Sequence, residues 1–94
     1  MSDRRFYVVA YDIPDDRRRA RVHRTLTGFG RWTQYSVFEV WATNKELVLL
    51  HDRLQRVLRA ERDSVRIYPL CQRCRAEVRT VGGSPPEEPW LFMV

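Results

Sequence analysis

The chain has 94 residues, 44% of them hydrophobic, which fits one small domain with disorder only at its ends. No apolar run reaches the ~20 residues of a membrane span, and the polar N-terminus does not resemble a signal peptide, so we expect a cytoplasmic protein. The net charge of +5, from 17 basic and 12 acidic residues, favours an anionic partner, with nucleic acid first.

The basic residues are almost all arginine, because Lys45 is the single lysine. The planar guanidinium matches phosphate and stays charged, which suits a nucleic-acid partner. A GC-rich genome or thermal adaptation would produce the same bias. The positions of the arginines, rather than their number, therefore have to decide.

Residues 4–12 predict the first strand. Residues 6–11 are all apolar or aromatic, which is typical of a strand buried on both faces. Asp12 ends this run, and its carboxylate is costly to desolvate, so it needs a partner, a bound metal or an opening to water. Tyr11 points the opposite way from Asp12 on an ideal strand, so we expect Tyr11 to pack in the core.

A helix follows Pro14, which stops the strand, and Asp15 or Asp16 can cap it. Gly28 and Gly30 are expected to end it, with Gly30 as a left-handed cap. Three apolar residues at i, i+4 and i+7 predict its core stripe: Val22, Leu26 and Phe29. Arginines occupy the other faces: Arg17, Arg18, Arg21 and Arg24. An acid at a strand end beside such a helix suggests a metal ion and a phosphate backbone.

Residues 31–41 are rich in aromatic and β-branched side chains, which predicts extended structure. Large apolar groups fall on both faces, so neither face is simply solvated. The segment is either one long strand or two strands that meet at a bend near residues 34–36.

A second helix begins after Thr43 or Asn44. Its apolar residues have a helical period and predict a core stripe: Leu47, Leu50, Leu54, Val57 and Leu58. Its arginines are expected on the solvated side: Arg53, Arg56, Arg59 and Arg62.

Residues 63–70 predict another strand, in which Pro69 marks the end or an edge. A turn at 71–74 and a short final strand at 76–81 are expected next. We expect a ferredoxin-like domain over residues 1–82. Residues 83–94 would form a Pro-containing linker and an apolar C-terminal segment that docks on a protomer.

Cys71 and Cys74 form a single C-x-x-C. Zinc needs four ligands, and the other soft candidates, His23 and His51, lie in the two predicted helices. A redox C-x-x-C normally opens a helix, whereas this one is predicted between two strands. We therefore interpret the pair as two turn thiols that are able to oxidise.

The predicted order of elements is that of a ferredoxin-like split βαβ fold, an α+β sandwich with an antiparallel sheet and two helices on one face. The helices can cover only that face, yet the first strand and the aromatic segment are apolar on both. A second copy of the sheet is the simplest cover, so we expect a two-fold homodimer packed sheet to sheet.

Four motifs together closely resemble the CRISPR-associated Cas2 family: Tyr11-Asp12-Ile13, the arginine run at 17–22, the segment 30–39 with Gln34-Tyr35-Ser36-Val37-Phe38-Glu39, and 63–68. The match spans about residues 5–82. The resemblance implies a homodimer that acquires new spacers with the larger Cas1 integrase. It also implies a divalent-metal-dependent endonuclease acting on single-stranded RNA or double-stranded DNA.

The family's metal-binding and catalytic aspartate matches Asp12, and its flanking functional positions fall on Tyr11, Arg19, Arg21, Arg31 and Phe38. Mg²⁺, or another divalent cation such as Mn²⁺, takes one or two carboxylates and keeps several waters. A dimer axis near the strand ends could bring two Asp12 carboxylates around one ion. Arg19, Arg21 or Arg31 could then hold the phosphate and stabilise developing charge.

Three alternatives stay open. Asp12 could form an ion pair with an arginine and take no part in catalysis. The dimer could be a non-catalytic DNA-binding scaffold that bridges integrase subunits through phosphate contacts. A weaker hypothesis is an RNA binder of the RRM type, which stacks bases on sheet aromatics such as Phe38 or Trp32.

Overall fold

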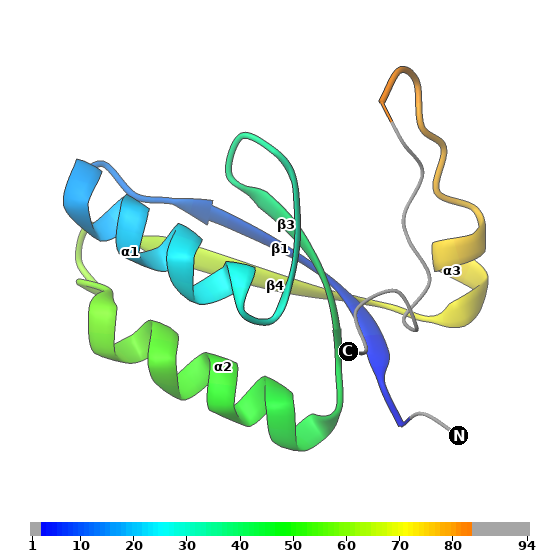
Figure 1. Ribbon diagram of the computed structural model, residues 1–94, viewed down its shortest axis with the longest axis horizontal. Helices are drawn as coiled ribbons and strands as arrows, with labels where there is room; N and C mark the ends of the chain where they lie inside the picture. Colours follow the sequence, from blue (N-terminus) through cyan, green and yellow to red (C-terminus); the bar gives the residue numbers. More distant parts are fainter. Residues whose placement is uncertain (1–2, 84–94) are drawn as a thin grey trace.

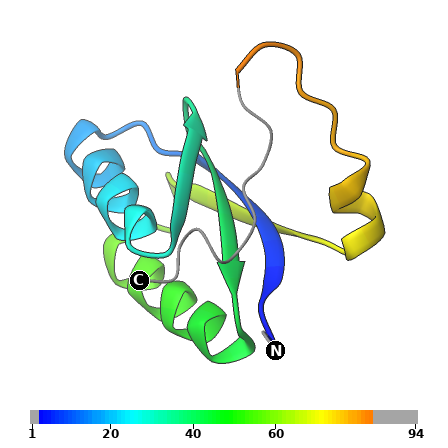
Figure 2. The same cartoon turned by 45° about the vertical axis from the view of Figure 1, so that its right-hand side comes forward.

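The computed structural model describes residues 3–83 and contains seven helices and strands in that range. In chain order they are β1 (Arg5–Asp12), α1 (Asp16–Thr27), β2 (Gly30–Gln34), β3 (Val37–Ala42), α2 (Asn44–Val57), β4 (Ser64–Leu70) and α3 (Gln72–Ala76). The sheet order is β2-β3-β1-β4, and every pair of neighbours is antiparallel. Helices α1 and α2 lie on the same side of this sheet (Figures 1 and 2). The predicted ferredoxin-like fold is confirmed.

The central strand β1 separates two faces by simple alternation. Tyr7, Val9 and Tyr11 point toward α1 and α2 and belong to the buried core. Phe6, Val8, Ala10 and Asp12 alternate with them on the opposite side, which we call the open face of the sheet. The outcome is a sheet with one face covered by helices and one face without them (Figure 2).

Each long helix begins with one of the two caps that the sequence offered, Asp15 for α1 and Thr43 for α2. The Asp15 carboxylate accepts a hydrogen bond from the Arg18 amide at 2.9 Å. Thr43 and Glu46 form a reciprocal capping box at the start of α2. The predicted stripes are also confirmed, with Val22 and Leu26 of α1 and Leu50 and Leu54 of α2 fully or almost fully buried.

Gly30 does not cap α1, so this prediction is wrong. The helix is capped by Gly28 with a right-handed φ of -76°, and Gly30 is already the first residue of β2. Its role is close approach, because a Cβ at Gly30 would lie 2.3 Å from the Glu39 carbonyl oxygen and 2.7 Å from Val40 Cγ2. Because Gly30 has no side chain, β2 can come close enough to β3 to pair with it.

The aromatic segment is a hairpin of two strands, β2 and β3, which settles the alternative in favour of a bend. Tyr35 occupies the turn with a φ of +43°, in the left-handed region. The Trp32 indole N–H donates to the Tyr35 carbonyl at 2.7 Å and closes the turn. The register of the strand pair shifts between Trp32 and Gln34.

The chain after β4 differs from the prediction. Strand β4 forms as expected, but Gln72–Ala76 is the short helix α3, and residues 76–81 form no strand. Glutamine, arginine and alanine are good helix formers, and Cys71 provides the cap. Val78 and Val81 are exposed rather than packed on a sheet. The predicted docking of the apolar segment 90–94 lies outside the described residues.

The helices within residues 3–83 are too short and too polar to include a membrane-spanning segment.

Candidate metal-binding and nucleic-acid interface

Asp12 is the last residue of β1 and is exposed on the open face, where its register partner on β4 is Ser64. The sequence left three possibilities for this carboxylate: a charged partner, a bound metal or contact with water. Its exposed position allows contact with water. None of the ion pairs among residues 3–83 involves Asp12, so the expected alternative of a local arginine partner does not hold there. The carboxylate is available to a ligand.

The donors around Asp12 fit a sparse metal site rather than a complete one. Within residues 3–83, no cluster of three or more histidine, cysteine, aspartate or glutamate side chains could hold an ion. Mg²⁺ accepts one or two carboxylates and completes its shell with water and phosphate oxygens. Asp12 is the candidate ligand in this chain, and waters, phosphate oxygens or the Asp12 carboxylate of a second copy could complete the shell.

Tyr11 and Phe38 lie on the helix-covered face of the sheet, in the core that α1 packs against. Phe38 is fully buried, and its ring centroid lies 6.3 Å from that of Tyr11 and 5.0 Å from the imidazole of His23. The Tyr11 hydroxyl is 3.2 Å from His23 Nδ1, and burial raises the pKa of this hydroxyl. Tyr11 packs in the core as predicted. Stacking of a base on Phe38 is ruled out by its burial.

Arg19 holds the loop that follows Asp12. Its guanidinium donates to the Ile13 carbonyl at 3.0 Å and also pairs with Asp16. The side chain is half-buried between these partners. Arg19 therefore fixes the backbone directly after the candidate metal ligand.

Arg18 and Asp63 form a buried ion pair that the sequence did not reveal. Arg18 Nε lies 2.7 Å and Nη2 3.1 Å from the two Asp63 carboxylate oxygens, and the Asp63 side chain is 0% exposed. The Arg59 amide also donates to Asp63 at 3.0 Å. These donors lower the pKa of Asp63. The helical pattern alone places Arg18 with the solvated arginines, because its partner lies 45 residues away.

The three predicted phosphate ligands do not converge within one chain. Arg19 lies beside Asp12, Arg21 is exposed on α1, and Arg31 is on β2, with β3 between it and β1. Arg31 pairs in register with Glu39. A substrate that touched all three would have to extend across both α1 and the sheet, or across two chains.

A groove of about 670 Å³ runs between α1 and the β2–β3 hairpin. Its lining combines cationic and aromatic side chains that the sequence did not connect with one another. They include Arg19, His23 and Arg24 from α1, and Trp32 and Tyr35 from the hairpin. Trp32 is 52% exposed, and its ring lies 5.7 Å from that of His23. The sequence showed the aromatic residues and allowed a bend near residues 34–36, but it did not show that the resulting hairpin packs beside α1.

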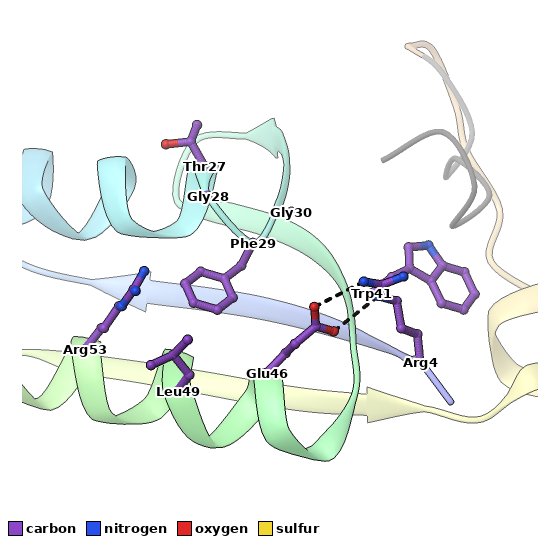
Figure 3. Close-up of a pocket in the computed structure, with 9 residues that line it drawn as sticks. All are labelled: Arg4, Thr27, Gly28, Phe29, Gly30, Trp41, Glu46, Leu49 and Arg53. Atoms are coloured by element: carbon purple, nitrogen blue, oxygen red, sulfur yellow. Dashed lines mark hydrogen bonds and ion pairs between the residues drawn. The ribbon is translucent and has the colours of Figure 1, made fainter. Parts of the chain in front are cut away.

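A second hollow of about 380 Å³ lies near the C-terminal end of α1 and the start of α2 (Figure 3). Arg4 makes a two-pronged ion pair with Glu46 at 3.2 and 3.1 Å, which lowers the pKa of the Glu46 carboxyl. The Arg53 guanidinium lies 5.5 Å from the Phe29 ring centroid. These cations already interact with neighbours, and the hollow contains none of the predicted site residues.

The histidines and cysteines do not form a four-ligand zinc site. His23 lies beside Tyr11 and Phe38, and His51 is exposed on α2, with neither belonging to a ligand cluster within residues 3–83. Cys71 caps α3 and Cys74 lies inside it. The C-x-x-C therefore opens a helix, contrary to the prediction that it connects two strands.

The fold and the surface define a class: a small ferredoxin-like domain with an exposed strand-end aspartate and a cationic helix. The family model described as CRISPR associated protein Cas2 matches residues 5–78. This chain therefore belongs to the Cas2 family, as its motifs had indicated.

Individual relatives agree with this assignment. A protein named CRISPR-associated endoribonuclease Cas2 3, from Synechocystis sp., is 44% identical over 80 residues, which cover 85% of this chain and 86% of the relative. The crystal structure of a hypothetical protein from Thermus thermophilus is similar with a TM-score of 0.80 at 39% identity, covering 90% of this chain and 99% of the other. A chain in a structure described as a partial Cas6-RT-Cas1--Cas2 complex has a TM-score of 0.75 at 25% identity, covering 89% of this chain and 92% of that one.

Proposed function

We propose that this protein acts in the cytoplasm as a homodimer in CRISPR spacer acquisition. In this proposal it binds nucleic acid and cleaves phosphodiester bonds with a divalent cation, Mg²⁺ or Mn²⁺, held by Asp12. One observation carries the proposal: the strand-end carboxylate is exposed, has no ion-pair partner within residues 3–83, and belongs to the open face of the sheet. The name of the Synechocystis relative supports the nuclease activity, and the likeness to a chain of a Cas1–Cas2 complex supports the integrase partner.

The proposed homodimer rests on the composition of the open face. Apolar side chains from three strands alternate onto this face: Phe6, Val8, Ala10, Val37, Trp41, Tyr68 and Leu70. Helices α1 and α2 cover the opposite side. On this side Phe6 is already buried and Arg75 lies over the Trp41 ring, but Tyr68 is 46% exposed and the other apolar side chains are only half-buried. A second copy would remove the apolar surface from water, at about 25 cal/mol per Å² buried. Since Asp12 lies on the same face, a two-fold axis near the strand ends would bring the two carboxylates close together.

Different residues of the chain have different roles in the proposed reaction. Arg19 fixes the carbonyl of Ile13 and so orients the strand end that carries Asp12. Arg21, exposed on α1, is available to contact phosphate oxygens. A divalent cation held by Asp12 would neutralise negative charge on the attacked phosphodiester. The same chemistry serves single-stranded RNA and double-stranded DNA, because both substrates present a phosphodiester.

Replacement of the Asp12 carboxylate tests the nuclease proposal. Asp12→Asn keeps the size of the side chain and removes its charge at an exposed position, so we expect folding and dimerisation to stay unchanged. Magnesium-dependent cleavage of labelled RNA and of duplex DNA should fall to background, with Asp52→Asn, at an exposed position on α2, as the control. Cleavage that persists unchanged in Asp12→Asn would refute a catalytic role for this residue.

A second candidate function is a DNA-binding scaffold without catalysis. It is favoured by three arginines exposed on α1, Arg17, Arg21 and Arg24, which offer sequence-independent phosphate contacts. A spacer-acquisition assay separates the two functions. The scaffold predicts acquisition that tolerates Asp12→Asn but not a triple alanine variant of these arginines, whereas an obligatory cleavage step predicts loss in both.

A further inference from the structure

The C-x-x-C segment is the one reactive cluster that the proposed function does not use. Cys71 follows β4 directly and caps α3, and Cys74 lies one turn further along. The Cys74 backbone N–H donates to Cys71 Sγ at 3.4 Å. Both thiols are exposed and neither is in a disulfide. The two sulfur atoms are therefore neighbours on one accessible turn.

The spacing of the two residues suits a bond between them. Side chains three positions apart on a helical turn have Cβ atoms about 5–6 Å apart. A disulfide requires Cα atoms about 4.4–6.8 Å apart and Cβ atoms about 3.5–4.5 Å apart. Because Cβ positions are fixed by the backbone, closing this gap requires a small backbone adjustment at the start of the short helix α3, together with rotation of the two exposed side chains, and no movement of the sheet.

The two thiols differ in reactivity. Hydrogen bonds from the Cys74 backbone amide and, second, from the Cys74 thiol lower the pKa of Cys71. The pKa of Cys74 is raised by its hydrogen bond to Cys71 and by the charge of the Cys71 thiolate. A thiolate is the nucleophile in exchange with disulfides, so Cys71 is the attacking residue and Cys74 the resolving one.

We propose that Cys71 and Cys74 form a redox-active dithiol that exchanges with disulfides of the glutathione class. The Cys71 thiolate attacks one sulfur of the oxidant, which breaks the oxidant's S–S bond, forms a mixed disulfide at Cys71 and releases one thiolate. Cys74 loses its proton to water and attacks Cys71 Sγ, which forms the Cys71–Cys74 disulfide and releases the second thiolate. Two electrons pass from the dithiol to the oxidant, which is reduced to two thiols.

Metal binding is the competing use of two neighbouring thiols. A structural zinc ion takes four ligands, and no third histidine, cysteine, aspartate or glutamate within residues 3–83 joins this pair. Disulfides in reducing compartments are mostly transient and either catalytic or redox-sensing, which agrees with an exposed, closely spaced pair.

Reaction with a chromogenic aryl disulfide tests the proposal on the full chain. The wild type should release two thiolates per chain and finish with an intrachain disulfide and no adduct, as seen by intact mass and peptide mapping. Cys74→Ser should stop at a stable mixed disulfide on Cys71 with one thiolate released. Cys71→Ser should react several-fold more slowly than Cys74→Ser at neutral pH, because Cys71 keeps the backbone hydrogen bonds that lower its pKa in Cys74→Ser, whereas no backbone hydrogen bond lowers the pKa of Cys74.

The reverse reaction and the metal content complete the test. The wild-type disulfide should return to the dithiol in reduced glutathione, and both serine variants should keep the circular dichroism spectrum of the wild type. Stable adducts on both cysteines of the wild type, or equal rates in the two serine variants, would overturn the proposal. So would one zinc ion per two chains that is lost in either variant. All these readouts are independent of nuclease activity.

Discussion

Arg18 at the start of α1 and Asp63 just before β4 form a two-pronged ion pair whose carboxylate is completely buried. The pair joins helix α1 to the residue preceding Ser64, and Ser64 is the register partner of Asp12. It therefore holds the strand end that carries the candidate metal ligand against the helix that carries the exposed arginines. Loss of one partner would leave the other charge buried and uncompensated.

Asp63→Asn should destabilise the protein most strongly near neutral pH. The pKa of Asp63 is lowered in the folded state, so its contribution to stability is fully present above the unfolded pKa of about 3.9. This contribution is lost as the pH falls through the lower folded pKa. Urea midpoints measured from pH 7 down to pH 3 should fall for the wild type below about pH 4 and change less steeply for Asp63→Asn.

The exposed pair Asp52–Arg56 provides the control for this experiment, because both side chains are more than half exposed. Asp52→Asn should shift the urea midpoint little. An Asp63→Asn midpoint equal to that of the wild type at pH 7 would show that the buried pair does not stabilise the fold.

Gly30→Ala should destabilise the β2–β3 hairpin through a backbone clash. The new Cβ would meet the Glu39 carbonyl and Val40 at distances that side chains do not tolerate, so we expect a loss of about 1–3 kcal/mol in the free energy of unfolding. Gly28→Ala is the matched control, because its Cβ would meet only the Thr25 carbonyl at 3.4 Å and its φ is right-handed. Thermal unfolding of the two variants compares them. Equal stability would contradict the close approach at Gly30.

Phe38→Ala should cost about 3–5 kcal/mol, because it removes a large and fully buried side chain beneath Tyr11 and His23. Any loss of activity in this variant should follow the folded fraction measured by urea titration. Val48→Ala, on the exposed side of α2, should change stability by less than about 0.5 kcal/mol. Loss of activity in a fully folded Phe38→Ala would indicate a direct role that the buried position does not explain.

Arg21→Ala should weaken the binding of DNA and RNA without changing stability. If Arg21 contacts one phosphate, the slope of log K against log salt concentration should fall by about 0.9 for duplex DNA. Arg56→Ala removes another exposed charge, on α2, that pairs with Asp52 and should change the slope less. Identical salt dependence in Arg21→Ala and the wild type would remove Arg21 from the interface.

The sequence predicted the parts of the fold that depend on local periodicity. The stripe through Val22 and Leu26, the caps at Asp15 and Thr43 and the alternation around Tyr11 each follow from side chains close in the chain. The errors concern features that depend on distant partners or on weak local signals. Gly30 depends on a carbonyl of β3, Arg18 depends on Asp63, and the alternation at 76–81 was too weak to outweigh the helix formers before it.

The candidate site was predictable to the same extent. Asp12 could be singled out because it ends an apolar run. Its exposure agrees with one of the three possibilities for such a carboxylate, namely contact with water. That Arg19 is engaged with Ile13 while Arg21 is exposed could not be predicted, because both occur in one arginine run. Whether two Asp12 residues meet depends on a second chain, which no property of a single sequence specifies.

Mixed dimers test the shared metal site most directly. Wild-type and Asp12→Asn chains would be unfolded together, refolded at varying ratios, and assayed for magnesium-dependent cleavage at constant total protein. A site built from two Asp12 carboxylates predicts activity proportional to the square of the wild-type fraction, since only dimers with both carboxylates are active. Activity proportional to the wild-type fraction itself would show that each chain acts alone and would contradict the shared site.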